Sequence, residues 1–407
     1  MVYLKVLLYE HACGGGFAES AVSPGILAEG FGMLRSCVVG FKAAGCEVVV
    51  VLAEELLRFN LLFEADCVVP VFSFSDAQQV ILKACGEVDA VYVIAPETGG
   101  TLYALVKLVE QNGVSTFNSH SSVIGEISNK VNLYKKLKVN KIRTPKTLHV
   151  NCDAQNIRQS IVDVFSFPVI IKPVDGVGCG GLSFVENVLQ VEDAVEKIAA
   201  EFDSENFIVQ EYLKGDAISV SLLCTGTKIL PISLNKQNVV LSAPKGVSCY
   251  VGGMVPFEHG KKQEAFQTAE AVVNCFSGLR GYVGVDLILT DVGSIVVDVN
   301  PRLTTSFIGL NRVAGFNFVD AIINATLNDI LPSKPGFSGY ACFSKVETPK
   351  FDVDFLDLLY SIPEIVSPPF PVYDSDVGCT LLSAEGNSLE QACYLLEEAK
   401  KYVLNIM

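Results

Sequence analysis

The sequence predicts a mixed α/β protein of more than one domain. The chain has 407 residues, of which half are hydrophobic, enough to form two or three cores. Its first hundred or so residues alternate continuous apolar strand-like runs with helix-like runs, which is typical of a parallel sheet. Beyond residue 214, strand-like runs follow one another directly and indicate antiparallel pairing.

The N-terminal elements follow from short apolar runs and their boundaries. The runs contain Val, Ile and Leu, and Gly or Pro ends most of them, so each reads as a buried strand or an amphipathic helix. We predict strands at 4–11, 46–52, 88–96 and 114–118, with helices at 23–45 and 98–113.

The middle and C-terminal elements are predicted in the same way. Residues 121–147 indicate a helix that leaves through Pro145 into an extended segment. A small unit then follows, with strands at 167–175, 181–187 and 206–213 and a helix at 191–202. Further on we predict antiparallel strands within 215–239, a helix at 261–279, a hairpin at 281–305 and a terminal helix at 388–404.

Composition excludes several classes of function. The net charge is −15, and the sequence has no basic stripe that could bind nucleic-acid phosphates, so we expect no nucleic-acid partner. No apolar run reaches the roughly 20 residues of a membrane span, and the N-terminus reads as a strand, so we predict a cytoplasmic protein without membrane contact. The thirteen cysteines include no C-x-x-C pair, which favours reduced thiols over disulfides or a zinc site.

Two aspartates interrupt the apolar runs of "GYVGVDLILTDVGSIVVDVNPRLTT". The "DVG" turn predicts a hairpin that brings Asp286 and Asp298 nearly opposite one another, with Asn300 on the same face. Oxygen ligands of this kind suit Mg²⁺ held together with substrate phosphates. The alternatives are a solvated hairpin end or a pair between an aspartate and Arg302 without any ligand.

A glycine-rich stretch, "KPVDGVGCGGLSFV", formally matches G-x-G-x-x-G through Gly176, Gly178 and Gly181. It connects two strands, whereas a dinucleotide site needs a strand followed by a helix. The backbone N–H groups of such a turn can still cover phosphates, and Lys172 could add a positive charge. The lysine precedes the loop and no H-R-D segment exists, which excludes a protein kinase. A flexible surface turn is the alternative.

Taken in order, these motifs resemble the ATP-grasp superfamily between about residues 115 and 325. The order is Lys130 in "SNK", then "VIIKP", the glycine loop, "VQEYLKG" and "DVNPR". The resemblance implies a ligase that binds ATP between two sheets, with two Mg²⁺ or Mn²⁺ ions. It also implies four parts: an N-terminal α/β domain (1–118), a lid with the glycine loop (119–213), a metal-binding domain built on an antiparallel sheet (214–330) and a C-terminal extension packed on the core (331–407).

The resemblance assigns roles to individual residues. Lys172 and Arg302 would be catalytic, Arg302 by stabilising an acyl-phosphate and a tetrahedral intermediate. Asp286, Asp298 and Asn300 would hold the metals. The nucleotide would contact Lys130, Lys172, Gly176, Gly178, Gly180, Gly181, Gln210, Glu211, Tyr212 and Leu213. Ala217 stands where many members carry a glutamate for the ribose, and Asp216 beside it is the substitute.

Further stretches resemble one branch of that superfamily, the tyramine–glutamate ligases of methanofuran biosynthesis: "YEHACGGGFAE", "SLNKQNV", "YVGGMVP" and "NPRLTTSFIGLNR". This implies an amide between the γ-carboxylate of glutamate and tyramine, with small-molecule partners and a homodimer as one assembly. A different amino acid and amine (tyrosine, for example) or a non-catalytic ATP-binding regulator are the alternatives. Substrate contacts would come from Glu10, His11, Lys236, Gln237 and Tyr250, although Glu10 and His11 also suit a buried hydrogen-bonding role.

Overall fold

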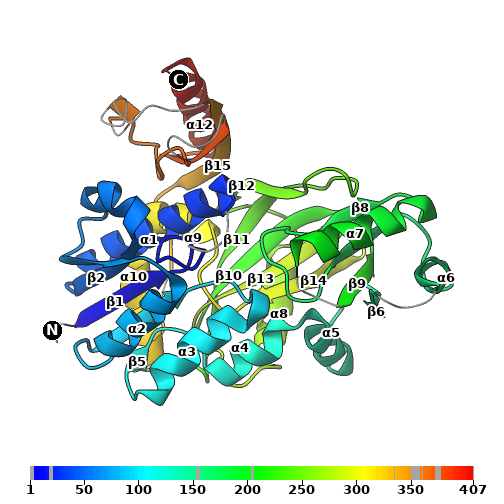
Figure 1. The fold of residues 1–407 in the computed structure, drawn as a ribbon, viewed down its shortest axis with the longest axis horizontal. Helices are drawn as coiled ribbons and strands as arrows, with labels where there is room; N and C mark the ends of the chain where they lie inside the picture. Colours follow the sequence, from blue (N-terminus) through cyan, green and yellow to red (C-terminus); the bar gives the residue numbers. More distant parts are fainter. Residues whose placement is uncertain are drawn as a thin grey trace.

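The computed structural model describes residues 4–17, 22–152, 156–202, 206–333, 335–349, 358–359, 361–371 and 377–406. Within these residues the chain forms a five-stranded, a four-stranded and a seven-stranded sheet. Figure 1 shows the five-stranded sheet on the left, the four-stranded sheet on the right and β10, β13 and β14 of the large sheet between them. The predicted mixed α/β class and its two kinds of sheet are confirmed.

The five-stranded sheet is wholly parallel, in the order β3-β2-β1-β4-β5. Its strands are β1 (Lys5–Glu10), β2 (Glu47–Ala53), β3 (Cys67–Val71), β4 (Ala90–Ile94) and β5 (Ser115–Thr116). One face packs on α1 (Pro24–Ala43) and the 3-10 helix η1 (Glu54–Phe63); the other packs on α2 (Phe74–Ala84) and α3 (Thr101–Gln111). The strand order reverses between β1 and β4, where such sheets present ligands at the carboxyl ends of their strands.

The four-stranded sheet is antiparallel and forms a small unit of its own, in the order β6-β9-β7-β8. Its strands are β6 (Thr147–Asn151), β7 (Val169–Pro173), β8 (Ser183–Val185) and β9 (Asn206–Glu211). The helices α6 (Ile157–Val162) and α7 (Val191–Glu201), the latter preceded by η3 (Val188–Gln190), share its core. The glycine loop connects β7 to β8, as the sequence predicts.

The seven-stranded sheet has the order β14-β13-β10-β11-β12-β15-β16. Its strands are β10 (Asp216–Cys224), β11 (Ile229–Val240), β12 (Cys249–Val255), β13 (Gly281–Thr290), β14 (Gly293–Asn300), β15 (Tyr340–Pro349) and β16 (Val377–Gly386). The β10, β13 and β14 end packs on α4 (Ser121–Ser128), α5 (Lys130–Val139) and α8 (Lys262–Val273). The β15 and β16 end shares a core with α1, α9 (Ser306–Val313), α10 (Phe318–Leu327) and α12 (Leu389–Ile406).

Packing bears on the domain boundaries that the sequence suggests. The helices α4 and α5, grouped with the lid on sequence grounds, contribute Val123 and Leu133 to the core of the large sheet. We therefore propose that the lid begins with β6. The C-terminal extension also does more than pack on the core, because β15 pairs with β12 and β16 pairs with β15.

The structure also bears on the expectations from composition. All thirteen cysteines lie among the described residues, and none of them forms a disulfide there. No helix in the described ranges is both long and apolar enough to cross a membrane.

Candidate active site

A cavity of about 430 Å³ lies between the small sheet and the large sheet. Its wall combines residues of β7, β9, the glycine loop, β10, β11, β13, β14 and the segment that follows β14. Fifteen of the residues that the sequence nominates line it together: Lys130, Lys172, Gly176, Gly178, Gly180, Gln210, Glu211, Tyr212, Leu213, Gln237, Tyr250, Asp286, Asp298, Asn300 and Arg302.

The hairpin of β13 and β14 brings its two aspartates into register. Asp286 and Asp298 are paired directly, and Asn300 is opposite Gly284. This pairing depends on a β-bulge, because Leu287 pairs with Val296 and Val297 is left without a partner. Without the extra residue Asp298 would slip to the opposite face, since neighbouring side chains alternate. The sequence predicts the facing carboxylates but not the bulge that produces them.

Lys130 reaches the cavity because the helix predicted for residues 121–147 is broken. The backbone at Asn129 has φ −90° and ψ 109°, and its side chain accepts hydrogen bonds from the N–H groups of Val131 and Asn132. This cap ends α4 and starts α5 at Lys130, whose N–H donates to the carbonyl of Val174. The Lys130 Nζ lies 2.5 Å from Asp298 Oδ2.

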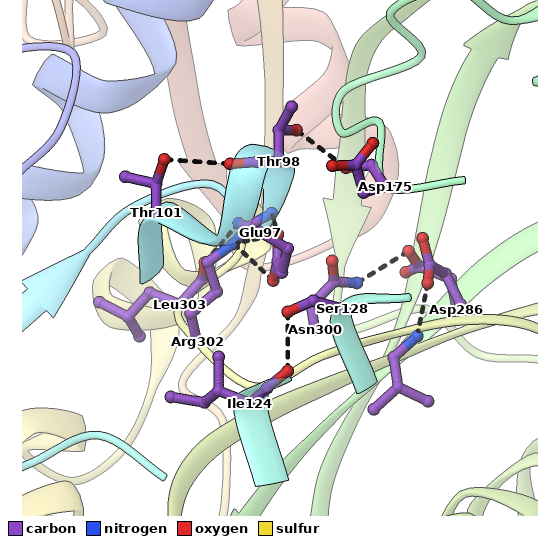
Figure 2. A network of polar contacts seen from close by, with 12 residues as sticks. Glu97, Thr98, Thr101, Ile124, Ser128, Asp175, Asp286, Asn300, Arg302 and Leu303 are labelled. Atoms are coloured by element: carbon purple, nitrogen blue, oxygen red, sulfur yellow. Dashed lines mark hydrogen bonds and ion pairs between the residues drawn. The ribbon is translucent and has the colours of Figure 1, made fainter. Parts of the chain in front are cut away.

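The charges around the hairpin are unevenly balanced. Burial alone would raise the pKa of Asp298, but Lys130 and Lys172 outweigh it and hold that pKa below its usual range. For Asp286, burial and the Asp298 charge outweigh the lowering effect of Arg302 and of its hydrogen bonds, so its pKa is raised to about 6. Its two oxygens accept hydrogen bonds from Gln237 and Asn300, each at 3.0 Å (Figure 2 draws the Asn300 contact).

This oxygen-rich end of the cavity fits a hard divalent cation. The two carboxylates face one another, and the pKa of Asp286 stays raised although Lys130 pairs with Asp298, so a further cation between them would relieve their repulsion. Among the described residues no three His, Cys, Asp or Glu side chains gather as a metal site. Asp286, Asp298 and the amide oxygen of Asn300 would therefore hold Mg²⁺ or Mn²⁺ together with oxygens of a bound phosphate compound.

Lys172 and the glycine loop form the opposite wall of this end. Lys172 is only 7% exposed, and burial together with Lys130 lowers its pKa to about 8. The loop turns through positive φ at Gly178 (+61°) and Gly181 (+66°), and a Cβ at Gly181 would come within 2.8 Å of Phe202. A Cβ at Gly178 would meet nothing within 4 Å, so the backbone there is open toward the cavity. Gly181 itself lies behind that wall, where its N–H donates to Glu201.

Arg302 has a partner that the sequence analysis missed. Its Nε and Nη2 both donate to the Glu97 carboxylate at 3.0 Å, and the pair is largely buried (Figure 2). The two residues that follow Glu97 contact Asp175, at the start of the glycine loop. Thr98 donates a hydrogen bond to the Asp175 carbonyl, and the N–H of Gly99 donates to the Asp175 carboxylate. Glu97 comes shortly after β4. Because parallel sheets present ligands at the carboxyl ends of their strands, this place in the sequence was the signal that could have identified Glu97.

Replacing Glu97 with glutamine is expected to lower the free energy of unfolding by about 3–5 kcal/mol, because the Arg302 guanidinium would stay buried without its counter-charge. Urea unfolding of the full chain measures the change. The matched control is E398Q, which removes the carboxylate of the exposed Lys401–Glu398 pair and should leave the free energy of unfolding nearly unchanged. Equal stability losses in the two variants would contradict the role of Glu97.

The segment from Gln210 to Leu213 consists of the last two residues of β9 and the two that follow, and all four line the cavity. Gln210 donates to Thr147, and Glu211 accepts from the N–H of Lys146, so both side chains are tied to the lid. Tyr212 makes an edge contact with Phe184. The segment is thus a fixed edge between the two sheets, suited to contacts through its backbone.

Asp216 and Lys236 do not line the cavity, contrary to expectation. Strand alternation explains this, because Asp216 shares its face of β10 with Ile218, which belongs to the core on the far side. Lys236 pairs with Ile218 in the register and lies 2.6 Å from Asp216. Ala217 does line the cavity. In this structure neither residue of this ion pair is part of the cavity wall.

Glu10 and His11 are also absent from the cavity wall. Both are 5% exposed. Glu10 accepts from the N–H of Cys13, and its burial raises its pKa to about 7. His11 has a pKa lowered by burial to about 4 and contacts Tyr9, Phe17 and Phe74. Their places fit the buried hydrogen-bonding alternative, not direct substrate contact.

Comparisons with known proteins agree with this geometry. Residues 127–306 match the ATP-grasp domain model and residues 43–124 match the pre ATP-grasp 3 domain model. The chain is 30% identical over 315 residues to the tyramine–L-glutamate ligase of Methanocaldococcus jannaschii, covering 76% of this chain and 86% of that relative. A crystal structure of biotin carboxylase from Campylobacter jejuni has a similar fold, with a TM-score of 0.72 at 15% identity over 97% of this chain and 90% of that one.

Proposed function

Because the chain belongs to the ATP-grasp family of ligases, we propose that it uses ATP to join the γ-carboxylate of L-glutamate to the amine of tyramine. Family membership implies that it binds ATP and uses a divalent metal. The observation that supports the proposal most is the gathering of Lys130, Lys172, the glycine loop, the paired aspartates and Arg302 around one cavity. The glutamate and tyramine assignment rests on relatives that are about 30% identical.

The first step would transfer the γ-phosphoryl group of ATP to the substrate carboxylate. A carboxylate oxygen attacks the terminal phosphorus, the bond to the bridging oxygen breaks, and ADP leaves with that electron pair. Lys172, Lys130 and the backbone of the glycine loop around Gly178 would position the phosphates. A divalent cation held by the aspartates would neutralise phosphate charge during this transfer.

The second step would form the amide. The free amine attacks the acyl-phosphate carbon, the resulting oxyanion lies near Arg302, and inorganic phosphate leaves as the amine proton is lost. Glu97 would keep the Arg302 guanidinium in place through its two hydrogen bonds. The glycine loop would shield the acyl-phosphate from water, and the contacts of Asp175 with Thr98 and Gly99 would hold the start of that loop in place.

ADP release over a matrix of amino acids and amines tests the proposal. We expect release that requires both L-glutamate and tyramine, with a γ-glutamyl amide detected by mass spectrometry. The matrix includes tyrosine as acceptor and D-alanine with itself, because the chain is also 29% identical over 189 residues to a D-alanine–D-alanine ligase from Fusobacterium nucleatum. Turnover only with another pair would retain the ligase mechanism and overturn the glutamate and tyramine assignment.

ATP affinity is expected to fall as the pH rises above about 8. Only protonated Lys172 can bind phosphate, and its pKa of about 8 in the nucleotide-free enzyme means that binding must take up a proton above that pH. The logarithm of the association constant should then decrease by up to about one per pH unit. Calorimetry measures it, and K172M should bind more weakly with no such decrease. A decrease of the same slope in K172M would contradict the assignment.

A further inference from the structure

Glu29, at one end of the cavity, forms an ion pair that handling of ATP does not explain; its partner Lys345 lies behind it and is not part of the cavity wall. Glu29 of α1 lines the cavity, together with Thr305 and Ser306 at the start of α9. The Lys345 Nζ, from β15, lies 2.6 Å from Glu29 Oε1, and the Thr305 hydroxyl donates to Glu29 Oε2 at 2.6 Å. Thr305 follows Arg302 by three residues, so this cluster and the reacting end of the cavity are formed by one segment.

The cluster is largely buried and is assembled from distant parts of the chain. The side chains of Lys345 and Glu29 are only 17% and 18% exposed. Removing two charges from water costs several kcal/mol each, and an apolar pair of similar volume would stabilise the fold as well or better. Packing alone therefore gives no reason for charges at this place, beside a cavity.

The charge distribution favours a zwitterion over a phosphate. A carboxylate in the wall repels phosphates, which Lys130 and Lys172 attract at the metal-binding end, and it attracts an ammonium group. The first turn of α1 lies beside Lys345 and offers a place for the carboxylate of such a zwitterion. Gly25 lies four residues before Glu29 on the same face, and a Cβ there would be 3.5 Å from the Lys345 Nζ.

That turn contains no acidic residue, and helix N-termini favour carboxylates. Glu29 thus provides a negative charge and Lys345 a positive charge, and the two charges are as close as the partners of one ion pair. An α-amino acid carries its ammonium and its carboxylate on a single carbon, so it presents both charges with the same close spacing.

We propose that Glu29 binds the α-ammonium and Lys345 the α-carboxylate of the amino-acid substrate, whose side-chain carboxylate then points toward Arg302. The inference rests on the proposed function and deepens it. In the substrate-free enzyme the two residues neutralise each other, and Glu29 but not Lys345 is part of the cavity wall. The bound amino acid would separate the pair and offer each residue a group with the charge of its former partner. Tyramine, which has no carboxylate, would satisfy only half of the pair.

Calorimetric titration of the full chain, saturated with Mg²⁺ and a non-hydrolysable ATP analogue, tests the inference. The ligands are L-glutamate, glutarate, which lacks the ammonium, and 4-aminobutyrate, which lacks the α-carboxylate. The wild-type chain should bind glutamate at least about tenfold more tightly than either analogue, the usual value of a charge-assisted hydrogen bond. E29Q should lose the preference over glutarate, and K345M the preference over 4-aminobutyrate.

Two further variants make the result decisive. E29Q/K345M carries no unpaired charge, so it should fold and lose both preferences. K236M breaks an ion pair on the far face of the sheet and should keep both. Retention of the wild-type preferences in E29Q/K345M would overturn the inference.

The inference and the proposed function can fail separately. Charge recognition of glutamate without amide formation would overturn the proposed function alone. If another amino acid binds in place of glutamate, the same comparisons with its deaminated and decarboxylated analogues decide the inference. Binding of no α-amino acid from the full set of twenty would overturn it.

Discussion

Replacing Asp298 with asparagine is expected to reduce ADP formation by about 10³-fold or more while the chain stays folded. The charge stabilisation that a bound metal supplies to phosphoryl transfer is worth several kcal/mol, and the variant would lose one of the two carboxylates placed to hold it. The side chain is 23% exposed and faces the cavity, so its replacement should disturb little packing, but Lys130 loses its partner and the variant should unfold at a lower urea concentration than the wild type. A coupled assay for ADP with glutamate and tyramine measures the rate, and circular dichroism checks the fold.

The control for this variant is D216N. Asp216 also belongs to the large sheet and is also paired with a lysine, but it lies on the far face. We expect D216N to turn over normally. Normal turnover in D298N, or equal losses in the two variants, would remove Asp298 from the metal site.

Replacing Arg302 with methionine is expected to lower kcat by about 10²–10³-fold and to change ATP affinity less than about threefold. The guanidinium lines the cavity beside Asn300, where charge would develop as the amine attacks, and loss of one such donor typically costs this much. Steady-state kinetics with both substrates gives kcat, and calorimetry gives the ATP affinity.

Stability must be separated from chemistry in this case. R302M alone leaves the Glu97 carboxylate buried without its counter-charge, so the variant should also unfold at lower urea concentration. E97Q/R302M removes both charges and should regain part of that stability without regaining turnover. A double variant with near wild-type kcat would contradict a role for Arg302 in the reaction.

Local patterns in the sequence determined most of the elements and one face of the site. Apolar alternation and turn residues predicted β7, β9, β10, the β13–β14 hairpin and the long helices, because strand and helix periods are local properties of the backbone. The same alternation put Asp298 and Asn300 on one face. The same alternation places Asp216 on the face of β10 that carries the apolar Ile218 and Val220, so the sequence already contained the information that excludes Asp216 from the cavity wall.

Only the tertiary structure decided which charged side chains pair with one another. Arg302 is 205 residues from Glu97, and Lys345 is 316 residues from Glu29, so neither pair leaves a mark on local periodicity. The bulge at Val297 and the helix break at Asn129 each change where a charged side chain points, and the break combines a local cap by Asn129 with a hydrogen bond from the Lys130 N–H to the distant Val174 carbonyl. Local spacing therefore determines which groups a segment offers, whereas the packing of segments far apart in the chain decides which groups meet.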